Sequence, residues 1–270
     1  MPAKKSISLH IGLDSVDPDQ YEGWNGALAA CEFDAKDMLA IARRQKFAAS
    51  HCLLTKKATS SAVLAAIGTA AEQLAPGGLF LLTYSGHGGQ VPDLNADERD
   101  GQDETWLLYD RMLVDDELFA QFARFKTGTR ILVFSDSCHS GTVTRMAPAE
   151  ARVRAPARLM PRKINERVYR AHQHRYDQLQ YVTKPAECGG IKATVILISG
   201  CQDNQLSLDG PRNGLFTEKL RKVWNGGRFR GSHRRFRDEI AAHLPPTQSP
   251  NYSVIGKPWP AFERQTPLCV

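Results

Sequence analysis

A histidine and a cysteine each stand just after an apolar run in this sequence. Residues 79–84 lead into Ser-Gly-His-Gly-Gly, centred on His87, and residues 131–135 lead into Asp-Ser-Cys-His-Ser-Gly, which contains Cys138. A cysteine attacks a carbonyl carbon as its thiolate, and a nearby histidine is the usual proton acceptor. The transition state also needs donors for its oxyanion, and the backbone N–H groups of Gly88 and Cys138 are natural candidates. The pair predicts acyl transfer; the alternative is a structural loop histidine and a buried thiol.

For this chemistry His87 and Cys138 must lie close together. Their positions depend on the strands or helices that precede the two motifs. Short apolar runs bounded by turns are typical of buried parallel strands, and segments with apolar residues at helical spacing lie between them. We expect strands at residues 7–13, 51–55, 79–84, 131–135 and 194–198, and helices at 27–45, 60–74, 115–125, 215–224 and 236–243. Alternating strands and helices predict an α/β fold, a three-layer α/β/α sandwich with a mostly parallel sheet. Sites in such sheets lie at the carboxyl ends of the strands, where both motifs fall.

Length and composition fit a folded domain rather than a disordered or membrane protein. The 270 residues are 42% hydrophobic and 24% charged, and no stretch approaches the roughly 18 apolar residues that a membrane span requires. The six cysteines form no CxxC pair, which indicates a reducing compartment. The first residues do not form a signal peptide. We expect a cytoplasmic protein without a membrane partner.

The net charge of +6 is concentrated in one segment. Residues 145–190 contain ten basic and four acidic residues, so the rest of the chain is neutral. Four prolines and dispersed arginines predict an exposed linker, with a helical patch only at residues 166–181. A basic segment admits nucleic acid as a partner, but no recognised binding motif accompanies it. We therefore do not expect a nucleic-acid partner.

The two motifs, 51 residues apart, also resemble the catalytic motifs of metacaspases, the caspase-like cysteine proteases of bacteria, plants and protists. Four further segments match the family in the same order. They are residues 30–35 (GCxND in the family), 97–110 (DGxDE), 114–117 (VDDE) and 199–205 (SGCxDxQ). The resemblance covers about residues 6–224. It implies a caspase-haemoglobinase fold, a His87–Cys138 dyad, and one catalytic domain over residues 1–270 with a basic, exposed linker at about 145–190.

The resemblance also implies cleavage after arginine or lysine. Asp136 lies two residues before Cys138 and so on the same side of an extended segment, while Asp34 and Ser85 match positions that line the family's pocket. Carboxylates at the floor of a pocket stabilise a guanidinium or ammonium group and reject an aspartate. The alternatives are a helix cap or salt bridge for Asp34 and a turn role for Asp136.

Acidic residues raise the question of a metal. Residues 93–104 place oxygen ligands at alternate positions, but Glu98 replaces the glycine that an EF-hand requires. In calcium-dependent metacaspases the ligands correspond to Asp103, Asp115, Asp116 and a fourth residue, which here is Arg145. An arginine at that position removes one negatively charged ligand, and its positive charge repels a bound Ca²⁺. The sequence thus supports a calcium site and a solvated acidic loop equally.

These observations favour a cysteine endopeptidase that acts on proteins or peptides with arginine or lysine at the cut. The basic linker is the expected site of activating cleavage, either by Cys138 itself or by an upstream protease. Three alternatives stay open: a catalytically silent caspase-like scaffold, a nucleic-acid-binding protein that uses the basic segment, and a calcium-independent, arginine-specific relative of the same fold.

Overall fold

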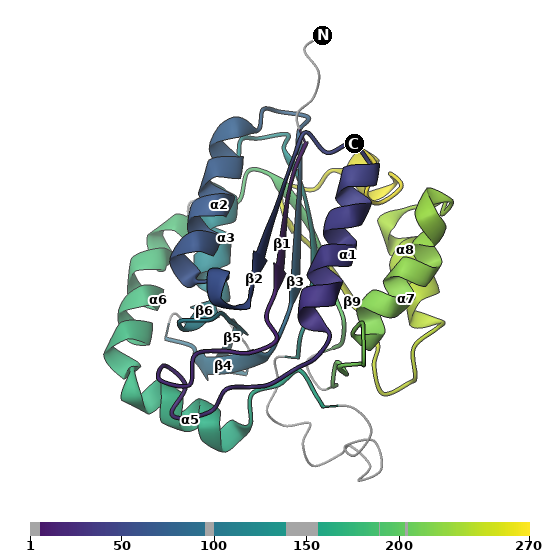
Figure 1. Ribbon diagram of the computed structural model, residues 1–270. Coiled ribbons are helices and arrows are strands. Elements are labelled where there is room, and N and C mark those ends of the chain that lie inside the picture. Colours follow the sequence, from purple (N-terminus) through teal and green to yellow (C-terminus); the bar gives the residue numbers. More distant parts are fainter. Residues whose placement is uncertain (1–5, 95–99, 139–155, 189, 203–204) are drawn as a thin grey trace.

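A central sheet of six strands organises the computed structural model, which describes residues 6–94, 100–138, 156–188, 190–202 and 205–270 (Figure 1). The strand order is β2-β1-β3-β7-β8-β9. The strands are β1 (Ser6–Gly12), β2 (Ala49–Leu54), β3 (Leu79–Ser85), β7 (Arg130–Asp136), β8 (Thr194–Ser199) and β9 (Asn251–Gly256). The first five are parallel, and β9 runs antiparallel at one edge. Because β1, β3 and β7 are buried along their whole length, they read as continuous apolar runs.

Helices cover both faces of the sheet and complete a three-layer sandwich (Figure 1). One face packs against α2 (Ser60–Gln73) and α3 (Asp115–Ala123), and the other against α1 (Cys31–Arg44), α7 (Leu215–Trp224) and α8 (His233–Ala241). Successive side chains of a strand point to opposite faces. Phe80 of β3 accordingly lies in the first apolar cluster, and Leu81 in the second. The short elements are η1 (Thr55–Lys57), η3 (Asn225–Gly227) and α9 (Pro260–Glu263).

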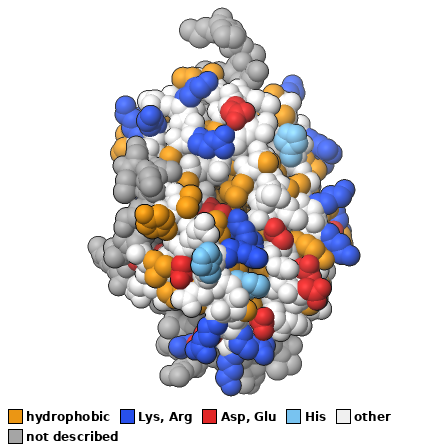
Figure 2. Space-filling view, turned by 90° about the vertical axis from the view of Figure 1, so that its left-hand side faces the viewer, with side chains coloured by type: hydrophobic (Ala, Val, Ile, Leu, Met, Phe, Trp, Pro, Cys, Tyr) orange, Lys and Arg blue, Asp and Glu red, His pale blue; other side chains and the backbone are white. Residues whose placement is uncertain are grey.

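A second, smaller sheet lies beyond the carboxyl ends of the central strands (Figure 1). It consists of β4 (Gly88–Pro92), β5 (Gln102–Leu107) and β6 (Met112–Val114), all antiparallel. Two helices, α5 (Arg162–Ala171) and α6 (Gln173–Cys188), pack against it through a buried apolar cluster. Figure 2 shows Lys and Arg side chains gathered at the lower end of the face on which α5 lies.

The structure confirms the predicted fold class and the five predicted strands. It adds β9 and the small sheet, which carry no clear apolar periodicity in the sequence. It also differs from the expectation of an exposed linker at 145–190, since Arg158, Met160, Val168 and Tyr176 are buried. Residues 139–155 lie outside the described residues. Within the described part of the chain, no helix is both long and apolar enough to cross a membrane.

Candidate active site

The carboxyl ends of β3 and β7 bring the two sequence motifs together. The strands pair in parallel with Ser85 opposite Asp136, and the N–H of Gly86 donates to the carbonyl oxygen of Asp136. His87 and Cys138 therefore follow adjacent strand ends by two residues each. This is the edge at which parallel sheets place their ligand sites.

The backbone beside the two side chains points at one common atom. The N–H groups of Gly88 and Cys138 each donate to the carbonyl oxygen of Arg158, both over 3.1 Å. Two convergent N–H groups stabilise a carbonyl oxygen, and stabilise it more strongly once it carries negative charge. The predicted donor pair thus forms a cradle for a carbonyl oxygen.

His87 is held in one tautomer by the backbone of a distant loop. Its Nε2 lies 3.0 Å from the carbonyl oxygen of Gly26, an acceptor only, so Nε2 carries the proton. The ring packs against Trp24 with a centroid distance of 4.8 Å. Within the described residues Nδ1 has no hydrogen-bond partner. Burial lowers the pKa of His87 to about 4 although the Gly26 bond opposes this, so the imidazole is neutral near pH 7 and its Nδ1 lone pair is available.

Cys138 is fully buried, and its sulfur contacts the backbone of Ser207, which follows β8. The N–H of Ser207 donates to Sγ over 2.6 Å, while the thiol lies 3.4 Å from the carbonyl oxygen of the same residue. These two contacts hold the sulfur in one position beside the Ser207 backbone. Ser207 is therefore a candidate for positioning the nucleophile.

A cluster of carboxylates beside Cys138 surrounds the guanidinium of Arg158. Its nitrogens lie 2.7 Å from Asp34, 2.9 Å from Asp136 and 2.9 Å from Asp209, and 2.8 Å from the hydroxyl of Ser85. All five side chains are buried. Burial opposes the charge of Arg158, but the carboxylates outweigh it and raise its pKa above the usual value. The carboxylates and the Ser85 hydroxyl thus enclose the planar guanidinium of Arg158.

Further hydrogen bonds fix the carboxylates in place. Asp34 accepts from the side chain of Asn213 and from the backbone N–H of Gly214, and Asp136 accepts from both the N–H and the hydroxyl of Thr217. Gly214 also forms a wall of the pocket. A Cβ atom at this position would lie 2.5 Å from the guanidinium carbon of Arg158.

The structure brings together every residue that the sequence analysis assigned to catalysis, to the oxyanion donors and to substrate binding. The N–H groups of Gly88 and Cys138 converge on the Arg158 carbonyl, His87 directly precedes Gly88, and Asp34, Asp136 and Ser85 contact the Arg158 guanidinium. Their roles in catalysis remain predictions. Sequence reasoning missed Gly26, Ser207, Asp209 and Arg158, which occupy loops and carry no periodic signal.

The three predicted metal ligands also lie together. Carboxylate oxygens of Asp103, Asp115 and Asp116 fall within 4.8 Å of one another. Asp103 belongs to β5, and the other two begin α3. An oxygen-only set of this kind fits a hard cation such as Ca²⁺. Arg145, the departure from the family's fourth ligand, lies outside the described residues.

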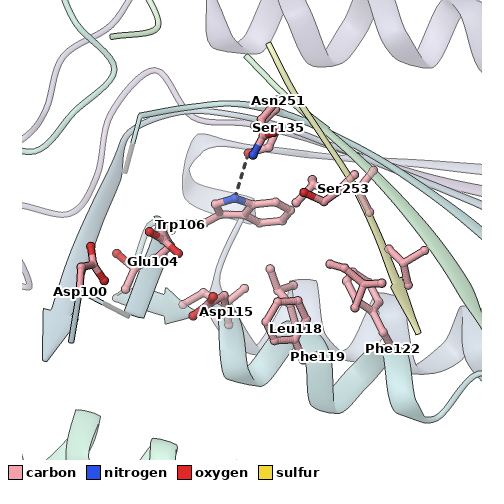
Figure 3. Close-up of a pocket in the computed structure, with 17 residues that line it drawn as sticks. Asp100, Glu104, Trp106, Asp115, Leu118, Phe119, Phe122, Ser135, Asn251 and Ser253 are labelled. Atoms are coloured by element: carbon pink, nitrogen blue, oxygen red, sulfur yellow. Dashed lines mark hydrogen bonds between the residues drawn. The ribbon is translucent and has the colours of Figure 1, made fainter. Parts of the chain in front are cut away.

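A cavity of about 610 Å³ adjoins this acidic triad and lies between α3, β5 and the β7–β9 part of the sheet (Figure 3). Asp100, Glu104 and Asp115 lie together at one end of it, while Leu118 and Phe122 of α3 form an apolar side. Trp106 and Ser135 both line the cavity, and the indole N–H of Trp106 donates to the hydroxyl of Ser135 over 3.1 Å. His87 and Cys138 do not line this cavity.

Comparison with known proteins connects this geometry to one family. The caspase domain family matches residues 16–266. Metacaspase-1A of Aspergillus terreus is 35% identical over 153 residues, which cover 51% of this chain and 36% of that protein. Metacaspase-1 of Cryptococcus neoformans is 35% identical over 152 residues, which cover 51% and 32%. The match thus spans about a third of the length of these curated relatives.

Two solved structures have a similar fold. The crystal structure of protein GSU0716 from Geobacter sulfurreducens is 51% identical, covers 98% of each chain and has a TM-score of 0.88. Caspase-1 from Spodoptera frugiperda is 10% identical and covers 93% of this chain and 86% of its own, with a TM-score of 0.57, which shows a shared fold alone. The chain belongs to the caspase domain family of peptidases, with metacaspases among its relatives, as the sequence resemblance predicted.

Proposed function

We propose that this protein is a cysteine endopeptidase that cleaves after arginine or lysine. The observation that carries this proposal is the placement of Arg158. Its guanidinium lies among three carboxylates, while its carbonyl oxygen receives two N–H groups beside the candidate nucleophile. A substrate arginine bound in the same way would present its carbonyl carbon to Cys138.

The geometry supports a two-step acyl transfer. Cys138 attacks the carbonyl carbon as a thiolate, which the Ser207 N–H stabilises, and the developing oxyanion is held by Gly88 and Cys138. His87 takes the thiol proton at Nδ1 and returns it to the leaving amine, because Nε2 is committed to Gly26. Water then hydrolyses the thioester with His87 as general base.

Specificity arises from the charge and shape of the pocket. Asp34, Asp136 and Asp209 supply negative charge, and an aspartate in their midst would be repelled. A lysine ammonium satisfies the same charges as a point cation but cannot form a bidentate contact. Arginine is therefore the preferred residue and lysine the second choice.

We also propose that calcium binds at Asp103, Asp115 and Asp116 and that cleavage within the basic linker at 145–190 activates the enzyme. Bound Ca²⁺ would supply positive charge that holds the three carboxylates together. Because Asp103 lies on β5 and Asp115 and Asp116 begin α3, the bound ion would link the small sheet to the helix layer. Processing by the enzyme itself or by an upstream protease is compatible with a pocket that prefers arginine.

A peptide panel tests the proposed activity. Fluorogenic peptides that differ only in the residue before the cut (Arg, Lys, Gln or Asp) are incubated with wild type and Cys138→Ala, with calcium and with a chelator. We expect hydrolysis of the Arg and Lys peptides by wild type only. Equal hydrolysis of the Asp peptide, or hydrolysis by Cys138→Ala, would contradict the proposal.

A further inference from the structure

The cavity in Figure 3 lies against one face of the central sheet, and neither His87 nor Cys138 lines it. Residues that pair across β7, β8 and β9 form its sheet side. From the carboxyl ends of β7 and β8 inward, these rows are Ser135, Ser199 and Asn251, then Val133, Leu197 and Ser253, then Val195 and Ile255. This side therefore changes from polar to apolar along the strands, and α3 adds a second apolar side.

One end of the cavity is acidic and contains a hydroxyl group without a partner. Figure 3 shows Asp100, Glu104 and Asp115 at this end and Phe122 at the other. No lysine or arginine is among the described residues that line the cavity. Thr105 of β5 lines it as well and is 1% exposed, and in the described part of the chain its hydroxyl has no hydrogen-bond partner. A buried polar group in this state costs free energy, which a ligand with a polar group of its own can relieve.

These features define the chemistry of a ligand. The volume of about 610 Å³ lies within the range of small-molecule sites, about 300–1,000 Å³. Carboxylates at one end favour a positive charge there and disfavour an anion. The apolar sides favour an aromatic or alkyl body, because they bury its surface. An amine or amidine with such a body, and with a hydrogen-bonding group for Thr105, matches the cavity from end to end.

Trp106 connects this cavity to the motif that contains Cys138. Its indole lines the cavity, and its N–H donates to the hydroxyl of Ser135 over 3.1 Å. The hydroxyls of Ser135 and Ser137 are hydrogen-bonded over 2.9 Å. Ser137 directly precedes Cys138. A ligand that packs against the indole is therefore two hydrogen bonds away from the residue next to the candidate nucleophile.

The same indole also supports the motif that contains His87. It stacks on the ring of Tyr84 with a centroid distance of 4.4 Å and an interplanar angle of 4°. The hydroxyl of Tyr84 donates to the carbonyl oxygen of His87 over 2.6 Å. In the small sheet, Trp106 lies opposite Gly88. One side chain thus contacts the cavity and holds both turns of the candidate active site.

We propose that this cavity binds a small organic cation with an apolar body, and that its occupancy holds Trp106, and with it the turns of His87 and Cys138, in the arrangement seen here. The site is separate from the arginine pocket and goes beyond the proposed function. A ligand increases the population of the conformation that it binds. In this conformation Cys138 is 0% exposed, so an occupied cavity should slow the reaction of its thiol with small reagents.

A fluorescence titration of the full chain tests the binding. The probe is dansylcadaverine, which joins an aromatic body to a primary ammonium, and its emission is followed with a chelator present so that calcium is absent. The matched neutral probe is N-acetyl-dansylcadaverine, and anilinonaphthalene sulfonate is the anionic one. We expect the cation to bind at least about tenfold more tightly than either, because charged hydrogen bonds contribute this much. Added salt should weaken binding of the cation but not of the neutral probe.

Three variants locate the bound probe. Ser253→Phe fills the cavity and should abolish binding, while Ser61→Phe, at an exposed position of α2 outside the cavity, should not. Asp100→Asn combined with Glu104→Gln removes charge without filling space. It should weaken binding of the cation by at least about threefold and leave the neutral probe unaffected. Asp209→Asn alters the arginine pocket instead and should bind the cation like wild type.

Alkylation of Cys138 by iodoacetamide, located by peptide mass spectrometry, tests the connection to the active site. Saturating dansylcadaverine should slow it by at least about threefold in wild type. Trp106→Phe should bind the probe without this effect, because phenylalanine cannot donate to Ser135. Neither measurement requires peptidase activity, so failure of the proposed function would leave both intact.

The outcomes bear on the two parts of the proposal separately. Equal affinity for the charged and the acetylated probe would refute the binding site. So would an Asp209→Asn variant that loses as much affinity as the variant at Asp100 and Glu104. Alkylation that stays unchanged at saturation, or that slows equally in Trp106→Phe, would refute the connection through Trp106.

Discussion

The backbone N–H groups of Gly88 and Cys138, which lie in separate motifs on neighbouring strands, donate to the same carbonyl oxygen at the same distance of 3.1 Å. The oxygen belongs to Arg158, whose side chain fills the adjacent acidic pocket. One residue thus occupies both the pair of convergent N–H groups and the acidic pocket. This relationship links the fold to the proposed chemistry.

Gly214→Ala should close the pocket to arginine without changing the nucleophile. The added Cβ would lie 2.5 Å from the guanidinium carbon and from both terminal nitrogens of Arg158, a distance that van der Waals contact does not allow. We expect kcat/KM for arginine peptides to fall by at least about tenfold, since misplacement of a substrate by about 1 Å can cost about 100-fold in rate. Alkylation of Cys138 by iodoacetamide in the processed enzyme should not change. Unaltered arginine hydrolysis would show that substrates do not bind where Arg158 does.

Asp209→Asn should weaken arginine binding, because this residue is the third carboxylate on the guanidinium. A hydrogen bond to a charged group contributes about 1.5–3 kcal/mol, so kcat/KM for arginine peptides should fall by about 10- to 100-fold. Asp37→Asn is the matched control, since Asp37 pairs with Arg221 and does not contact Arg158. Equal effects of both substitutions would contradict a specific role for Asp209.

The strand ends with His87 and Cys138 were predictable, because apolar runs of a parallel sheet end at one common edge. Asp209 and Ser207 were not, since they occupy the chain between β8 and α7, where no periodicity indicates a fold. Arg158 was one of ten basic residues in segment 145–190 and composition does not distinguish it from the others. Its role follows only from burial and from the atoms around it.

Calcium should bind at the acidic triad, formed by Asp103, Asp115 and Asp116. Terbium should bind there in place of calcium and serve as a luminescent probe. Trp106 lies on β5 with Asp103 and lines the same cavity as Asp115, so it is close enough to transfer energy to a bound lanthanide. Asp115→Asn should weaken calcium binding by at least about tenfold in calorimetry, because ligand charge sets affinity. Trp106→Phe should reduce the luminescence but not the binding.

Asp100→Asn is the matched control for this site, since Asp100 lines the cavity but is not part of the triad. It should bind calcium like wild type. A wild type that shows no calcium binding, or an Asp115→Asn variant that binds equally well, would refute the proposed metal site.

His10 should make the fold less stable in mild acid. Burial between the strands lowers its pKa from 6.5 to about 3, so below pH 6.5 the unfolded chain takes up a proton that the folded chain refuses. The contribution of His10 to the free energy of unfolding therefore falls by about 1.4 kcal/mol for each pH unit below 6.5. Urea midpoints between about pH 6.5 and 4.5 should fall less steeply in His10→Gln than in wild type. His51→Gln, at an exposed position of β2, should keep the wild-type slope, and equal slopes in all three proteins would contradict the account.

The most direct test of the central claim is covalent labelling of the processed enzyme with an arginyl chloromethyl ketone, with the modified residue located by peptide mass spectrometry. The account predicts one label per chain, on Cys138, and none on Cys31, whose buried thiol has a raised pKa. It also predicts that an aspartyl reagent of the same length labels far more slowly. Labelling at another cysteine, or no preference for the arginyl reagent, would contradict the account.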